Sequence, residues 1–124
     1  MIWVITDHHD TRVVLVPLIV KVGYRVTEID CGEHVVKRIQ FQWPRLFIID
    51  CALPDGFELI AKIRADHRAR SIPIVMFSTG SENFKDKALL LGADAYVPKG
   101  SLDWAELLAE IGRFAGPPPL SNPG

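Results

Sequence analysis

The chain has 124 residues, of which 48% are hydrophobic and 23% charged, with 14 Lys and Arg against 15 Asp and Glu. A chain of this length buries enough apolar surface for one domain with its own core, which excludes a wholly disordered protein. The net charge of -1 gives no overall basic field, so neither nucleic-acid binding nor attachment to an anionic membrane is indicated. The longest apolar run, Val13–Val20, is far shorter than the roughly 20 residues of a transmembrane helix.

The start of the chain and its cysteines bear on the cellular compartment. Met1 leads straight into the apolar run Ile2–Ile5, without the basic segment and cleavage site of a secretory signal peptide. The chain has only two cysteines, Cys31 and Cys51. We therefore expect a cytoplasmic protein with no membrane segment.

Short apolar runs rich in β-branched residues alternate with longer amphipathic stretches. The runs are Ile2–Ile5, Leu46–Ile49, Ile72–Phe77 and Ala95–Val97. This alternation predicts parallel βα units, because unbroken apolar strands suit a sheet that is covered on both faces. Residues 24–29 mix polar and apolar side chains, so we expect a further strand there, at an edge of the sheet.

Glycines and a possible capping box indicate where helices begin and end. Gly23 and Gly92 follow apolar helical stretches, where a residue with positive φ commonly ends a helix. Asp55, with Glu58 three residues later, predicts a capping box at the start of a central helix.

The first predicted helix contains a proline, and the last has a capping residue at its start. The first covers Asp10–Val22, and Pro17 removes one of its backbone hydrogen bonds, which predicts a kink near residues 13–17. The last covers Leu102–Phe114 with Ser101 as its cap. Its buried side chains are expected to be Leu107, Leu108 and Ile111. One domain then occupies 1–115, and the proline-rich segment 116–124 is expected to be a disordered tail or linker.

Polar residues lie at the carboxyl ends of the predicted interior strands. Asp7 and Asp50 follow the first two apolar runs, and Ser78 and Lys99 follow the other two. The carboxyl ends of parallel strands meet at one edge of a sheet, so these side chains are expected to converge there. The two carboxylates suit a divalent cation such as Mg²⁺, and the hydroxyl and ammonium groups suit phosphoryl oxygens.

Four segments together resemble the receiver domain of two-component response regulators. They are Thr6–Asp10, Pro44–Pro54, Ile72–Ser78 and Gly92–Lys99, and the likeness covers about residues 2–115. The resemblance implies an α/β, flavodoxin-like, doubly wound fold. Its five-stranded parallel sheet has the order 2-1-3-4-5, with helices on both faces.

The resemblance also implies how the site is used. Asp50 would be the phosphoacceptor, receiving a phosphoryl group from a histidine kinase or phosphotransfer protein. Mg²⁺ would bind Asp7, Asp50 and the backbone carbonyl of Ala52. Lys99 and Ser78 would then contact the phosphoryl oxygens.

Signalling would follow from a change at the surface beyond the site. Tyr96 matches the aromatic switch position of the family, and the face around residues 83–111 would meet an output domain or target protein. Val13–Val20 is more apolar than one buried face requires, which leaves a homodimer open, although core packing is favoured. The domain would not be an enzyme beyond self-phosphorylation from small donors and autodephosphorylation.

The chain departs from the family pattern at four places. Thr6 stands where receivers usually have a first acid, and the loop between Asp50 and Gly56 is about two residues short. Gly100 replaces a usual cis proline, so a trans bond is expected there. The region 78–99 is about one residue short. Loss of the first acid predicts a metal site weakened about 10–100-fold rather than abolished.

These departures support an alternative, a degenerate receiver that works as a phosphorylation-independent interaction module. A small hydrolytic enzyme is a third possibility. An aspartate-nucleophile phosphatase would carry a second acid where Ala52 lies, and the sequence has no GxSxG motif and no glycine-rich phosphate loop. We therefore do not favour a hydrolase.

Cys31 and Cys51 are not expected to form a disulfide. They follow the two strands that flank the first strand, and two strand spacings of about 4.8 Å separate them by roughly 9–10 Å. A disulfide tolerates a Cα separation of only about 7 Å. Cys51 is interpreted as a buried structural cysteine rather than a redox thiol beside Asp50.

The four histidines are expected at the surface and Trp104 in the core. His8 and His9 are adjacent in a turn with no second cluster to complete a metal site, so we expect solvated loop residues. His34 and His67 are expected on helix surfaces. Trp104 either fills the core or lies on a partner-binding face, and the core is favoured.

Overall fold

The computed structural model describes residues 1–31, 33–52, 54–79, 82–99 and 104–118. Five parallel strands form one sheet in the order β2-β1-β3-β4-β5, which confirms the predicted fold class. The strands are β1 (Ile2–Thr6), β2 (Val26–Ile29), β3 (Leu46–Asp50), β4 (Ile74–Ser78) and β5 (Ala95–Pro98). None of the helices in the described ranges is long and apolar enough to cross a membrane.

The burial of each strand follows its composition. Every residue of β1, β3 and β4 is buried, whereas in the edge strand β2 only Ile29 is buried, as its mixed sequence predicts. β4 begins at Ile74, two residues later than predicted. Pro73, which has no N–H to donate to a neighbouring strand, precedes it and accepts a hydrogen bond from Phe47 N–H at 3.0 Å.

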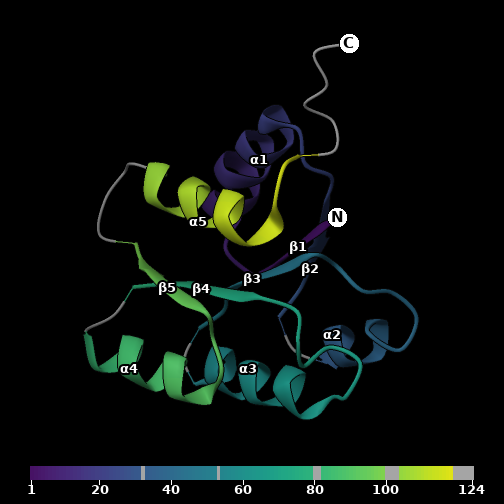
Figure 1. The fold of residues 1–124 in the computed structure, drawn as a ribbon. Coiled ribbons are helices and arrows are strands. Elements are labelled where there is room, and N and C mark those ends of the chain that lie inside the picture. Colours follow the sequence, from purple (N-terminus) through teal and green to yellow (C-terminus); the bar gives the residue numbers. More distant parts are fainter. Residues whose placement is uncertain (32, 53, 80–81, 100–103, 119–124) are drawn as a thin grey trace.

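Helices cover both faces of the sheet (Figure 1). One face carries α1 (Val16–Val22) and α5 (Ala105–Ala115), and the other carries α2 (Glu33–Arg38), α3 (Asp55–Ala65) and α4 (Glu82–Leu91). Successive strand residues point to opposite faces, so each strand supplies both cores. Trp3 and Phe47 pack edge to face beneath α2–α4 with ring centroids 5.6 Å apart, while Ile48 and Val75 pack against α1 and α5.

The predicted first helix is two pieces. Thr11–Leu15 forms a π-helical turn, in which the N–H of Val16 bonds to Thr11 O, and α1 begins at Val16. Pro17 lies in the first turn of α1, where its missing N–H does the least harm. The change of hydrogen-bond pattern falls within residues 13–17, where the sequence predicts a kink. Leu15 and Ile19 are buried, whereas Val13 and Val20 stay about half exposed, at 51% and 49%.

Two predicted helix ends are confirmed and one is wrong. Gly23 and Gly92 have φ values of 121° and 119°, as expected for residues that end helices. The capping box does not form, because α3 begins at Asp55 itself. Pro54 occupies the N-cap position and no side chain caps the helix.

The last helix is shorter at its start than predicted. Trp104 occupies the N-cap position of α5, and the predicted cap at Ser101 lies outside the described residues. Leu107 and Ile111 are buried as expected, and Leu108 is partly buried against the same core. Trp104 packs on Phe77 with ring centroids 5.3 Å apart, which agrees with the favoured core interpretation.

The chain leaves α5 along the body of the domain. The hydroxyl of Tyr24 donates to Gly116 O at 2.5 Å, and Arg45 Nη1 lies 3.4 Å from Pro117 O. Residues 119–124 lie outside the described part of the chain. The division into a domain at 1–115 and a tail at 116–124 therefore stays a prediction.

Gly92 is a position where a side chain should be costly. A Cβ there would lie 2.6 Å from Arg64 Cγ, and the φ of 119° is strained for any L side chain. We expect Gly92→Ala to lower the free energy of unfolding by about 1–3 kcal/mol in urea denaturation. Gly112→Ala is the control, because a Cβ there meets nothing within 4 Å and should stabilise α5 by about 0.5–1 kcal/mol. Equal effects of the two substitutions would contradict this account.

The prediction that Cys31 and Cys51 stay unpaired is wrong. The two residues form a disulfide with their Cα atoms 5.9 Å apart. The estimate from strand spacing fails because both residues lie beyond the last residues of their strands, Ile29 and Asp50. β1 lies between β2 and β3 but ends at Thr6. Beyond that point it no longer separates the segments that follow β2 and β3, so the two cysteines can approach each other.

Candidate functional site

The ends of four strands bring polar side chains to one edge of the sheet. Thr6 and Asp50 are register partners at the ends of β1 and β3. Lys99 N–H donates to Ser78 O at 2.9 Å, which joins the chain after β5 to the end of β4. A cleft of about 460 Å³ opens at this edge, and Asp50, Ser78 and Lys99 line it together with Ala52 and His8.

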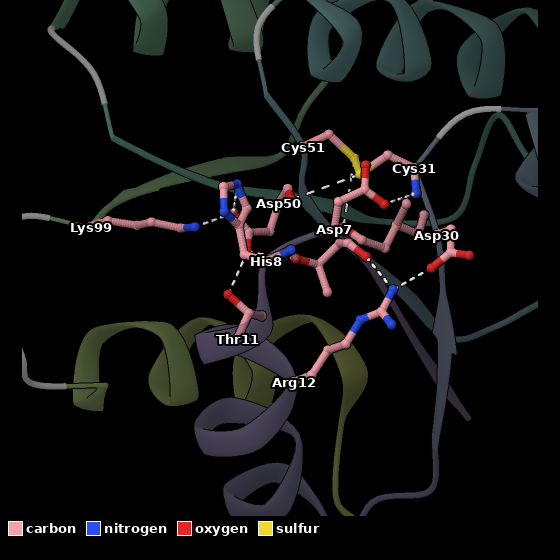
Figure 2. The surroundings of a disulfide bond; sticks show 11 residues. Asp7, His8, Thr11, Arg12, Asp30, Cys31, Asp50, Cys51 and Lys99 are labelled. Atoms are coloured by element: carbon pink, nitrogen blue, oxygen red, sulfur yellow. Dashed lines mark hydrogen bonds and ion pairs between the residues drawn. A yellow bond between two sulfur atoms is a disulfide. The ribbon is translucent and has the colours of Figure 1, made fainter.

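Asp50 lines this cleft and is 1% exposed. Its Oδ2 accepts hydrogen bonds from the hydroxyl of Thr6 at 2.9 Å and from the hydroxyl of Thr11. Its Oδ1 forms an ion pair with Lys99 Nζ, and His8 Nε2 lies 3.8 Å from the same oxygen. Figure 2 shows Lys99 and His8 approaching Asp50 from the side opposite the disulfide.

Thr6 links the phosphoacceptor candidate to the turn after β1. Its hydroxyl donates to Asp50 and accepts from His8 N–H at 2.9 Å, so it acts as a donor and an acceptor at once. Its carbonyl accepts from Arg12 Nη2 at 2.8 Å. Arg12 also binds the carboxylate of Asp30, and this hydrogen bond raises the pKa of Arg12 above its ordinary value. The guanidinium therefore stays charged beside the site.

Asp7, the other predicted cation ligand, points elsewhere. Its Oδ1 accepts a hydrogen bond from Cys31 N–H at 3.0 Å. It lines a separate cleft with His9, Arg12 and Asp30, while Asp50 lines the first one. The structure thus brings Asp50, Ser78 and Lys99 together and leaves Asp7 apart from them.

Among the described residues that line this cleft, Asp50 alone carries a carboxylate, because Asp7 is turned toward Cys31 N–H, and this position of Asp7 does not suit Mg²⁺. The ion needs several oxygen ligands, but hydroxyl, ammonium and imidazole groups surround Asp50. The carbonyl of Ala52 accepts a hydrogen bond from Gly56 N–H at 3.1 Å, and a carbonyl oxygen has a second lone pair that a cation can use. Within the described ranges, no three His, Cys, Asp or Glu residues are grouped so that they could hold a metal ion. The magnesium site therefore stays a prediction that needs a different position of Asp7.

The predicted switch residues Ser78 and Tyr96 are both buried, but their hydroxyls differ in hydrogen bonding. Ser78 is 7% exposed, and its hydroxyl donates to Thr79 O at a long 3.3 Å. Tyr96 is buried in the core under α2–α4, and its hydroxyl has no hydrogen-bond partner among the described residues. A buried hydroxyl without a hydrogen bond destabilises the folded state by about 1–3 kcal/mol. A position of Tyr96 in which its hydroxyl finds a partner would therefore be more stable.

Sequence reasoning missed two contacts of Asp50. His8 was expected to be a solvated loop residue, and its side chain is 51% exposed, but its ring reaches toward the Asp50 carboxylate. Thr11 carries no motif in the sequence, yet it is 1% exposed and its hydroxyl donates to Asp50. The π-helical turn that begins at Thr11 places this hydroxyl, and such turns occur frequently at functional sites. His67 is exposed as expected, but it lies in the turn after α3 and not on a helix. The His34 side chain lies outside the described part.

Comparison with known proteins places the fold and the strand-end residues in a family. The chain matches the family model of the response regulator receiver domain over residues 2–112. The receiver domain of sensor histidine kinase PA1611 from Pseudomonas aeruginosa has a TM-score of 0.81 at 27% identity, covering 93% of this chain and 96% of that one. That crystal structure has a magnesium ion in its active site cleft.

Curated relatives give the same family. The chain is 28% identical over 113 residues to the phosphate regulon transcriptional regulatory protein PhoB of Escherichia coli, covering 89% of this chain and 49% of PhoB. It is 34% identical over 101 residues to histidine kinase P4 of Formosa agariphila, covering 79% of this chain and 7% of that protein. The chain thus spans about half or less of these two relatives. Because the family match covers most of the chain and the fold agrees, the chain belongs to the response regulator receiver domains of two-component systems.

Proposed function

We propose that this receiver domain accepts a phosphoryl group on Asp50 from a histidine kinase or phosphotransfer protein. The observation that carries the proposal is the Asp50 carboxylate, which lines an open cleft and forms an ion pair with Lys99. An oxygen of Asp50 attacks the phosphorus of a donor phosphohistidine. The P–N bond breaks, its electron pair returns to the donor imidazole, and an acyl phosphate remains on Asp50.

The surroundings of Asp50 suit an added phosphoryl group. Phosphorylation adds negative charge and acceptor oxygens. The ammonium of Lys99 and the hydroxyls of Thr6 and Thr11 already point at this carboxylate. Ser78, whose present hydrogen bond is long, is available to turn toward the new oxygens.

Magnesium stays the proposed cation, at Asp7, Asp50 and the Ala52 carbonyl. The magnesium ion in the cleft of the Pseudomonas receiver domain supports this assignment. In this chain the ion would require Asp7 to leave Cys31 N–H and turn toward Asp50. When bound, it would offset the negative charge of the carboxylates and the phosphoryl group.

Phosphorylation would be communicated through Tyr96 to the face around residues 83–111. The hydroxyl of Tyr96, which has no hydrogen-bond partner in the described part of the chain, supports a side chain with two positions at this place. The proposed partner on that face is an output domain or a target protein, and a homodimer through the exposed valines of α1 is a further proposal. We propose that the domain signals in the cytoplasm without catalysing turnover of its own.

A second candidate function is favoured by the position of Asp7. If Asp7 stays bonded to Cys31, the acid pair is never assembled and Asp50 keeps its protein donors. The domain would then be a degenerate receiver that binds its partner irrespective of phosphorylation.

Intact mass measurement separates the two candidates. Incubation of the chain with acetyl phosphate and millimolar Mg²⁺, under a thiol reductant, is expected to add one phosphoryl group. The gain should disappear in Asp50→Asn and persist in Asp55→Asn, which alters an exposed carboxylate nearby. No gain in the wild-type chain would support the degenerate receiver, and a gain that survives in Asp50→Asn would refute Asp50 as the acceptor.

A further inference from the structure

The Cys31–Cys51 disulfide lies at the edge of the phosphoacceptor site (Figure 2). On the basis of the function proposed for Asp50, we propose that this cysteine pair is a reversible thiol–disulfide modification site whose closure holds Asp7 away from Asp50. The pair exchanges with dithiols, either small molecules or proteins. Opening the disulfide frees Asp7 to share a divalent cation with Asp50.

The disulfide joins two segments that belong to the site. Cys51 directly follows Asp50, the last residue of β3, and Cys31 lies two residues after the end of β2. β1 runs between these two strands and ends at Thr6, so the bond crosses the chain that leaves β1. With its Cα atom held 5.9 Å from that of Cys51, Cys31 has its backbone fixed beside Asp7.

The backbone of Cys31 is what holds Asp7. The Cys31 N–H donates to Asp7 Oδ1 at 3.0 Å, and a hydrogen bond to a charged carboxylate is stronger than one between neutral groups. Asp7 also shares its cleft with the guanidinium of Arg12, which favours the same position. Because the donor is a backbone group of a cross-linked residue, it cannot swing away as a side chain does. Breaking the cross-link releases this restraint.

The two cysteine residues differ in exposure, which favours one direction of exchange. Cys31 is partly exposed and Cys51 is 3% exposed, so an incoming thiolate meets Cys31 Sγ. A new S–S bond forms there, the Cys31–Cys51 bond breaks, and its electron pair leaves on Cys51, which takes a proton. The second thiolate of the dithiol then attacks the sulfur that the dithiol contributed to the mixed disulfide. A disulfide forms within the dithiol, and Cys31 leaves as a thiolate that takes a proton. The protein gains two thiols and the dithiol becomes a disulfide.

The surroundings also suit the reduced pair. Cys51 Sγ lies 3.7 Å from Ile5 O and Cys31 Sγ lies 3.9 Å from Asp50 O. A disulfide sulfur has no hydrogen, so these are contacts in the oxidised form. After reduction each thiol can donate to the carbonyl beside it, and neither is left without a partner.

Titration with Mg²⁺ alone tests the proposal on the full chain. Isothermal titration calorimetry of the reduced protein is expected to give an affinity at least about tenfold higher than that of the oxidised protein. Mass mapping after alkylation verifies the state of the cysteines in each sample. Equal affinities, no measurable binding in either form, or unfolding of the reduced protein would overturn the proposal, since the disulfide would then be purely structural or without effect on the cation.

Two variants identify the residues responsible. The double variant Cys31→Ser, Cys51→Ser should bind Mg²⁺ like the reduced protein whether or not an oxidant is present. Asp7→Asn should bind weakly in both redox states, with no difference between them. A redox effect that persists in Asp7→Asn would show that Asp7 is not the group held by the disulfide.

The phosphorylation assay keeps this inference separate from the proposed function. If the reduced chain binds Mg²⁺ more tightly but gains no phosphoryl group from acetyl phosphate, the proposed function fails and the redox control of the site stands. If the reduced and oxidised chains are phosphorylated alike and bind Mg²⁺ alike, the proposed function stands and the redox control fails.

Discussion

Replacing Lys99 with Met is expected to lower the free energy of unfolding by about 2–4 kcal/mol, because a buried carboxylate loses its charged partner. Asp50 is 1% exposed and pairs with Lys99 through Oδ1. The hydroxyls of Thr6 and Thr11 still bind Oδ2 in the variant, which keeps the loss below the full cost of an unpaired buried charge. Methionine retains the aliphatic part of the side chain, so the change reports mainly on the ammonium group. Urea unfolding under a thiol reductant measures the effect.

A double-mutant cycle tests whether the ion pair is the cause. In the Asp50→Asn background the site has no negative charge to balance, so Lys99→Met should cost less than about 1 kcal/mol. Lys85→Met, at an exposed position of α4, is the matched control and should change stability by less than about 0.5 kcal/mol. A cost for Lys99→Met that is the same in both backgrounds would mean that packing, rather than charge, explains it.

The sheet could be predicted because strand position depends on local composition. Fully buried strands need continuous apolar runs, and β1 and β3 follow the runs that begin at Ile2 and Leu46. The order of the strands came from the family resemblance, and the structure has the same order. Helix starts were harder to predict, because a cap depends on the conformation of one or two residues. Asp55, for example, is the first residue of α3 and does not cap it.

The sequence predicts the positions of those site residues that lie at strand ends, but not the directions of side chains that depend on loops. Asp50, Ser78 and Lys99 converge because parallel strands end at one edge, which the sequence pattern already implies. The direction in which Asp7 points depends on Cys31, a residue in the loop after a different strand. Loop paths beyond strand ends leave no periodic signal, and for the same reason strand spacing gave the wrong distance between the two cysteines.

Thr6→Asp is expected to make the stability of the domain depend on Mg²⁺. Thr6 is fully buried, and its hydroxyl lies 2.9 Å from Asp50 Oδ2. A carboxylate at this position removes a hydrogen-bond donor and sets two negative charges side by side, which should lower the free energy of unfolding by about 2–4 kcal/mol without a cation. A divalent cation bound between the carboxylates offsets this repulsion. Thermal unfolding of the reduced variant should therefore shift to a higher Tm when Mg²⁺ is added, by more than the wild type shifts.

Thr6→Val separates the added charge from the lost hydroxyl. Valine has nearly the same shape as threonine but neither donates to Asp50 nor accepts from His8 N–H, so it should destabilise the fold without creating a cation ligand. If Mg²⁺ raises the Tm of Thr6→Val as much as that of Thr6→Asp, the ion does not bind at this edge of the sheet. A larger rise for Thr6→Asp alone would place the cation beside Asp50, and would show that the threonine weakens a cation site which the rest of the edge still supports.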